Sequence, residues 1–208
     1  MRDLIALARA CVGAAAAACV LVTAACDRGE DGRHAAPGSA AVSGARTYSV
    51  YDLESVWRDQ RGAARTLGSL RGRPQVLSLI YTNCTSICPF TVAAIQLVEQ
   101  QVGDQAGYVL VSLDPERDSP QRLAAYAAEH RLSSRWTLLS GPEGSVRELA
   151  ALVGVKYRRV AEGEIDHSAV LLVLDANGRM VARFDQPDAV DRAAAEVRRL
   201  APSTTHTP

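Results

Sequence analysis

Cys84 and Cys88 are the residues of this chain whose type and spacing most directly indicate chemistry. They form a C-x-x-x-C motif followed by Pro89, between an apolar run and a segment of helical periodicity. On a helical turn, two such side chains project from one face and can bind one ion or form a disulfide. The start of a helix also stabilises thiolate, the form that binds metals and attacks disulfides. A structural disulfide is the alternative, because exported proteins meet an oxidising compartment.

The metal that would suit these thiols depends on the remaining ligands. Thiolates favour copper(I) and zinc, and imidazole binds both. Structural zinc usually takes four protein ligands, which disfavours it here, whereas copper(I) accepts two thiolates and one imidazole. Copper(II) could use the same atoms with an added oxygen or water. Among the four histidines, His167 is the best candidate because it directly precedes a predicted buried strand. Its neighbour Asp166 either hydrogen-bonds the imidazole or caps that strand.

The other three histidines suit different roles. His130 ends a predicted helix, where a cation meets the helix dipole favourably, so we expect a structural role for it. His34 and His206 lie in polar segments near the two ends of the chain. We expect both to be solvated.

Strands and helices alternate along the chain and must position these residues. Nearly continuous apolar runs predict strands buried on both faces, and apolar residues at helical spacing predict the helices. Asn177-Gly178 between apolar runs predicts a hairpin. The order indicates an α/β sandwich with a central mixed sheet flanked by helices. We predict strands or extended segments at residues 48–53, 66–70, 75–81, 108–113, 136–139, 155–160, 168–174 and 179–184, and helices at residues 90–102, 120–130, 146–153 and 188–200.

The composition indicates one globular domain without an attraction to nucleic acid. The chain has 208 residues, of which 48% are hydrophobic, enough for one well-buried core. Its 23 lysines and arginines equal its 23 aspartates and glutamates. The resulting lack of net charge argues against nucleic acid as a partner. We place the domain at residues 48–200, followed by a disordered tail at residues 201–208.

Residues 1–26 have the pattern of an export signal. Two arginines precede an uncharged, alanine-rich run that ends in small residues and Cys26. This ending resembles the bacterial lipoprotein signal, in which such a cysteine is lipidated and becomes the anchor. An ordinary secretory signal or an uncleaved anchor is the alternative. Residues 27–47 are rich in glycine, alanine and serine and predict a flexible tether.

Three motifs together resemble the Sco/SenC family of membrane-tethered, thioredoxin-like copper chaperones. They are YTNCTSICP at residues 81–89, SLDPERDSP at residues 112–120 and DHS at residues 166–168. The resemblance implies that Cys84, Cys88 and His167 bind copper and that Asp118 supports the site. Asn83 and Thr85 depart from the family, which more often has aromatic and proline residues there.

The resemblance also implies a partner and a location. The protein would be a metallochaperone for the binuclear copper centre of cytochrome c oxidase, with the copper-receiving oxidase subunit and other copper chaperones as partners. Its domain would lie on the extracytoplasmic, periplasmic side of the membrane.

Two other functions remain open from the sequence. A redox-active disulfide between Cys84 and Cys88 would make the protein a thiol-disulfide reductase that keeps the client's copper-ligating cysteines reduced. Redox sensing or peroxide removal is a third possibility. Whether the protein is an enzyme therefore depends on whether the dithiol exchanges electrons as well as metal.

Overall fold

A seven-stranded mixed sheet forms the centre of the computed structural model, which describes residues 48–160, 163–185 and 189–201. Its strands are β1 (Val56–Asp59), β2 (Ala64–Thr66), β3 (Gln75–Ile80), β4 (Gly107–Ser112), β5 (Trp136–Ser140), β8 (Leu171–Leu174) and β9 (Met180–Phe184). Their order in the sheet is β2-β1-β5-β4-β3-β8-β9. Strands β3, β4 and β5 run parallel, and the remaining pairs are antiparallel.

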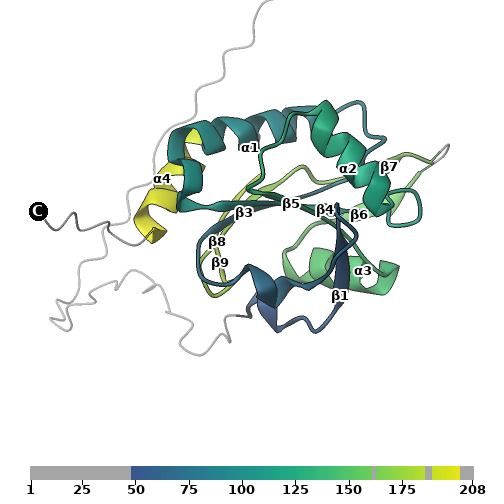
Figure 1. Cartoon of the computed structure of the whole chain (residues 1–208), viewed down its shortest axis with the longest axis horizontal. Coiled ribbons are helices and arrows are strands. Elements are labelled where there is room, and N and C mark those ends of the chain that lie inside the picture. Colours follow the sequence, from purple (N-terminus) through teal and green to yellow (C-terminus); the bar gives the residue numbers. More distant parts are fainter. Residues whose placement is uncertain (1–47, 161–162, 186–188, 202–208) are drawn as a thin grey trace, which may run out of the picture. The chain divides into compact units, whose positions relative to one another are not determined.

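Helices cover both faces of this sheet (Figure 1). Helices α1 (Cys88–Val102), α2 (Pro120–Glu129) and α4 (Val190–Leu200) lie on one face, and α3 (Glu143–Leu152) lies on the other. Every residue of β3, β4 and β8 is consequently buried. This burial on both faces explains the continuous apolar runs in the sequence and confirms the predicted thioredoxin-like sandwich with a mixed central sheet.

The helix boundaries follow local capping chemistry. Pro89 occupies the first turn of α1, where its missing N–H costs no hydrogen bond. The Ser119 side chain caps α2 by accepting a hydrogen bond from the Arg122 backbone N–H at 3.2 Å. Gly154 follows α3 with a φ of 69°, a left-handed conformation that glycine adopts without strain. The four predicted helices are confirmed, although α3 begins earlier than its apolar spacing indicated.

A separate two-stranded sheet stands apart from the main sheet. It pairs β6 (Tyr157–Arg159) with β7 (Ile165–His167) in antiparallel register, with Tyr157 opposite His167. We call β6, β7 and the described residues between them, 160, 163 and 164, the His167 hairpin. Among the described strands, neither β6 nor β7 pairs with the seven-stranded sheet. His167 therefore ends a strand of its own hairpin, with residues 168–170 between it and β8, rather than directly preceding a buried strand as predicted.

The segments 48–53 and 66–70 were wrongly predicted to be extended. Val50–Asp52 and Leu67–Leu70 are short 3₁₀ helices, as is Gly103–Gln105. Ser49 caps the first of these, because its hydroxyl accepts a hydrogen bond from the Tyr51 backbone N–H at 3.0 Å. Val50 and Tyr51 are both buried. In a strand with only one face covered, two successive side chains would point to opposite faces, and one of them would be exposed.

The predicted signal at residues 1–26, Cys26, the tether at residues 27–47 and nearly all of the predicted tail lie outside the described residues, as do His34 and His206. Within the described part of the chain, no helix combines the length and apolar character needed to cross a bilayer.

Candidate metal centre

The loop after β3 brings the two cysteines together. Cys84 lies in a turn in which its backbone N–H donates to the Tyr81 carbonyl at 3.1 Å, and Cys88 is the first residue of α1. The Cys88 backbone N–H donates to Cys84 Sγ at 3.4 Å. The spacing alone suggested that the two residues share a helical turn. In the structure they do not, because only Cys88 belongs to α1. Their thiols are nevertheless neighbours at the start of α1, and both are free.

The environments of the two thiols differ. Burial opposes ionisation of Cys84, but hydrogen bonds from Cys88 and Ser86 outweigh it and lower the pKa of Cys84 from 9.0 to about 7. Burial raises the pKa of Cys88, and its hydrogen bond to Cys84 adds to that increase. Cys84 is 6% exposed, whereas Cys88 is fully buried. The thiolate that we expected at this helix start is therefore Cys84 rather than both cysteines.

Alkylation should reveal this difference. Below pH 7 the rate at Cys84 in the reduced protein should rise about tenfold per pH unit, and it should level off above pH 7, because iodoacetamide attacks thiolate. Cys88 should react more slowly at every pH. Peptide mass spectrometry separates the two sites from the other cysteines. In urea both should react with the pH dependence of an ordinary thiol, and equal rates in the folded protein would contradict the asymmetry.

The His167 hairpin places an imidazole beside the thiols. His167 Nε2 lies 3.4 Å from Cys88 Sγ. Its other nitrogen, Nδ1, lies 3.2 Å from the Ser168 carbonyl oxygen. Because a carbonyl can only accept, this contact assigns the proton to Nδ1 and leaves the Nε2 lone pair facing the thiols. Burial lowers the pKa of His167, despite the opposing effect of the Ser168 carbonyl, and so favours this neutral form.

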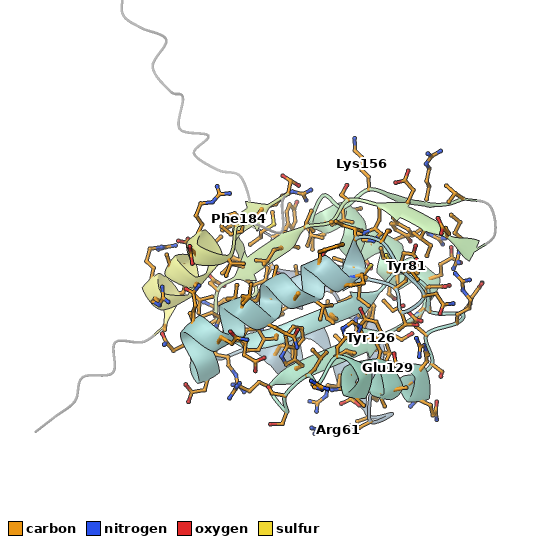
Figure 2. The ribbon with its side chains drawn as sticks, turned by 90° about the horizontal axis from the view of Figure 1, so that it is seen from above. Arg61, Tyr81, Tyr126, Glu129, Lys156 and Phe184 are labelled. Atoms are coloured by element: carbon orange, nitrogen blue, oxygen red, sulfur yellow. The ribbon has the colours of Figure 1, made fainter. Side chains whose placement is uncertain are left out.

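Tyr81 forms one wall of the site. Its ring meets the His167 ring edge to face, with centroids 5.9 Å apart and planes at 77°. Tyr81 follows directly after β3. Figure 2 labels both Tyr81 and Lys156, the residue before β6, and shows the Lys156 side chain projecting into solvent. An open pocket of about 380 Å³ lies between the cysteine loop and the hairpin. Cys84, Ile87, Val160 and His167 are among its lining residues.

Cys84, Cys88 and His167 have the geometry of a three-donor metal site. Their two Sγ atoms and one imidazole nitrogen all lie within 4.8 Å of one another. Metal–sulfur and metal–nitrogen bonds of about 2.3 and 2.0 Å place donors of one ion up to roughly 4.5 Å apart. Two soft sulfurs and one imidazole suit copper(I) or zinc. A single ion therefore fits with only small movements of the side chains.

Asp118 lies behind the cysteine loop rather than among the three donors. Its carboxylate is buried and accepts hydrogen bonds from the Thr82 backbone N–H at 3.1 Å, the Thr82 hydroxyl at 2.5 Å and the Ser112 hydroxyl at 2.6 Å. Arg122 in turn donates to the Thr82 hydroxyl at 3.1 Å. Since Thr82 is two residues before Cys84, these bonds fix the backbone that leads into the thiols.

Asp166 and His130 do not belong to the three-donor group. The Asp166 side chain is 61% exposed and pairs with Arg158 across the hairpin at 3.1 Å. Of the two roles open to it from the sequence, the hydrogen bond to the imidazole is not observed, because His167 Nδ1 faces the Ser168 carbonyl. His130 packs on the Tyr126 ring, with centroids 4.2 Å apart, at the end of α2.

Asp114 and Arg159 form an ion pair that the sequence did not reveal. The Asp114 carboxylate is buried and binds both Arg117 and Arg159. In the sequence Asp114 looks like part of an ordinary Asp-Pro turn, and Arg159 like one of many dispersed arginines. No local pattern could have paired residues 45 positions apart.

Known proteins are similar to this chain in sequence and in fold. A family model described as SCO1/SenC matches residues 51–202. The "SCO1 protein homolog" of Bacillus subtilis is 27% identical over 143 residues, covering 65% of this chain and 74% of the relative. The structure of Bradyrhizobium japonicum ScoI with copper bound is 28% identical, has a TM-score of 0.61, and covers 70% of this chain and 96% of that one.

A plant structure is similar to a comparable degree. Arabidopsis thaliana ScoI with copper bound is 25% identical and has a TM-score of 0.62, with coverage of 70% of this chain and 96% of that one. The fold, the grouping of two cysteines with one histidine and the family match over most of the chain lead to one conclusion: this chain belongs to the SCO1/SenC family.

Proposed function

We propose that this protein is a copper-binding metallochaperone that acts in assembly of the binuclear copper centre of cytochrome c oxidase. The observation that carries the proposal is the convergence of two thiols and an imidazole nitrogen within 4.8 Å. Similarity to two Sco structures with copper bound supports copper as the metal. The copper is cargo, received from another carrier and passed to an oxidase subunit.

Each ligand has a defined task in this proposal. Cys84 and Cys88 supply thiolates, and His167 supplies Nε2 as the third donor. The thiol that binds first is Cys84, because it is the more acidic and the less buried of the pair. Asp118 supports the site by holding Thr82. The open pocket beside Cys84 and His167 gives a client's ligands room to approach, so copper can leave by ligand exchange.

We further propose that the domain works at a membrane on its extracytoplasmic side. The export pattern of residues 1–26, ending at Cys26, supports this location. Lipidation of Cys26 would leave 21 residues, 27–47, before the domain. A chain of that length and composition spans about 25 Å by the random-coil relation. The domain would stay close to a membrane-bound client.

A specific observation also favours a second function, reduction of a client's disulfide. The pKa of Cys84 is lowered and that of Cys88 is raised, which suits an attacking and a resolving thiol. The Cys84 thiolate would attack one client sulfur, forming a mixed disulfide and releasing the other as thiolate. Cys88, on losing its proton, would then attack the Cys84 sulfur, which breaks the mixed disulfide and releases the second client sulfur as thiolate. The client gains two electrons, and this chain ends as the Cys84–Cys88 disulfide.

Copper titration of the reduced protein tests the main proposal. We expect the wild-type protein to bind one equivalent of copper(II) with a sulfur-to-copper charge-transfer band. Cys88→Ser should lose the band, since serine oxygen is a much poorer ligand for soft copper. Absorption spectroscopy and equilibrium dialysis give the stoichiometry. If the wild-type protein bound no copper but reduced a model disulfide, the chaperone function would be refuted and the reductase function would take its place.

A further inference from the structure

One loop touches both halves of the metal centre. It consists of residues 113–119 and connects β4 to α2. Near its end, Asp118 holds Thr82 and thereby the cysteine loop. At its start, Asp114 holds Arg159 of the His167 hairpin. Ser112 links the two acids, because its hydroxyl donates to Asp118 at 2.6 Å and accepts from the Asp114 backbone N–H at 2.9 Å.

Asp114 is a buried carboxylate that pairs with one arginine of its own loop and with one arginine of the His167 hairpin. Its side chain is 1% exposed, and its two carboxylate oxygens bind Arg117 and Arg159, the latter at 2.9 Å. The Arg117 guanidinium reaches further and donates to the Gly163 carbonyl in the His167 hairpin. A carboxylate removed from water must stay paired, because an uncompensated buried charge is strongly unfavourable. The fold therefore favours states in which the arginines stay in place.

Side-chain contacts, rather than strand pairing, attach the His167 hairpin to the rest of the described structure, and they include the packing of Ile165 and Tyr157 on the core. Its strands pair with each other and with no other described strand, and each has three residues. Arg159 stands opposite the buried Ile165, and Tyr157 stands opposite His167. Asp114 thus holds the hairpin at β6 through Arg159 and near the start of β7 through Arg117 and Gly163. Gly163 is four residues before His167, and Arg159 stands opposite Ile165, which is two residues before His167.

We propose that Asp114, with Arg117 and Arg159, positions His167 over the cysteine thiols by fixing the hairpin that carries it. We call these three residues the Asp114 ion-pair cluster. Its members touch none of the metal donors, so they are positioning residues. The part of the proposal that concerns copper rests on the proposed function. The part that concerns the hairpin does not, and it can be measured on the metal-free protein.

The experiment compares two neighbouring arginines of the same hairpin. Arg159→Gln removes the bond to Asp114 and leaves Arg117 to pair with it, so that the fold should survive. Arg158→Gln is the matched control, because it changes the net charge equally but breaks only the exposed pair with Asp166. The first readout is amide hydrogen exchange at residues 163–167 in the reduced, metal-free protein. The second is copper affinity.

Arg159→Gln should increase hairpin exchange and weaken copper binding, each about tenfold, the effect expected for one charge-assisted hydrogen bond. Arg159→Lys should restore part of both, and Arg158→Gln should change neither. Unchanged exchange in Arg159→Gln would overturn the proposal, as would equal effects of the two Gln variants. Faster exchange with unchanged copper affinity would also overturn it, since the hairpin would then not position the ligand.

The two proposals can fail separately. If the wild-type protein bound no copper, the proposed function would be refuted, while hydrogen exchange would still decide whether the cluster fixes the hairpin. If Arg159→Gln behaved like the wild-type protein in both readouts, only the role of the cluster would be refuted.

Discussion

Replacement of His167 by alanine is expected to weaken copper(II) binding by more than about 100-fold. Removing a residue that only hydrogen-bonds a metal ligand costs about 10- to 100-fold in affinity, and the loss of a ligand itself should cost more. His167 supplies the only nitrogen of the three-donor group, and its Nε2 lies 3.4 Å from Cys88 Sγ. Without it, two thiolates remain, and thiolates favour copper(I) over copper(II). The charge-transfer band of the copper(II) protein should disappear in a spectroscopic titration of the reduced variant.

His130→Ala is the matched control for this experiment. His130 packs against Tyr126 at the end of α2 and takes no part in the three-donor group. The His130→Ala protein should bind copper with the affinity of the wild-type protein. The His167→Ala dithiol should still cycle between reduced and oxidised forms, because neither cysteine is changed. Undiminished copper(II) affinity in His167→Ala would remove His167 from the ligand set.

Asp118→Ala is expected to lower the free energy of unfolding by about 3 kcal/mol or more, because buried donors that lose their acceptor each cost roughly 1–3 kcal/mol. The carboxylate accepts from the Thr82 backbone N–H, the Thr82 hydroxyl and the Ser112 hydroxyl, all in a buried setting. Urea unfolding followed by the fluorescence of the buried Trp57 and Trp136 measures the change.

Two comparisons make the Asp118 result specific. Glu116→Ala removes an exposed acid of the same loop and should change stability by less than about 0.5 kcal/mol. Asp118→Asn keeps the shape and part of the accepting capacity, so its cost should lie between the other two. Copper affinity should fall in the order of stability, since Thr82 leads into Cys84. An Asp118→Ala protein as stable as wild type would show that Thr82 and Ser112 find other partners.

If the two proposals hold, this arrangement would keep the one distant ligand in position. Cys84 and Cys88 come from one segment, and His167 comes from a small hairpin 79 positions after Cys88. The loop of residues 113–119 contacts the two segments through separate buried acids, Asp118 and Asp114. Disturbance of either acid should therefore affect a different half of the centre.

The sequence by itself determined the class of fold and the chemical nature of the site. Runs such as residues 75–80 are nearly continuous in apolar residues, because the central strands are covered on both sides, so their type is visible locally. The helices could be predicted from their spacing and caps. Cys84, Cys88 and His167 could be singled out because thiols and imidazole bind soft metals, and because the motifs that contain them together resemble those of the Sco/SenC family.

The tertiary structure alone decided the details that depend on long-range contacts. Hydrogen bonds from Cys88 and Ser86, acting against burial, lower the pKa of Cys84, whereas burial raises the pKa of Cys88. Ser168, not Asp166, faces the imidazole Nδ1. Asp114 and Arg159 meet only when β6 folds back over the loop after β4. The physical reason is common to all three cases: desolvation and pairing of a polar group depend on which distant segments surround it, and local patterns carry no record of those neighbours.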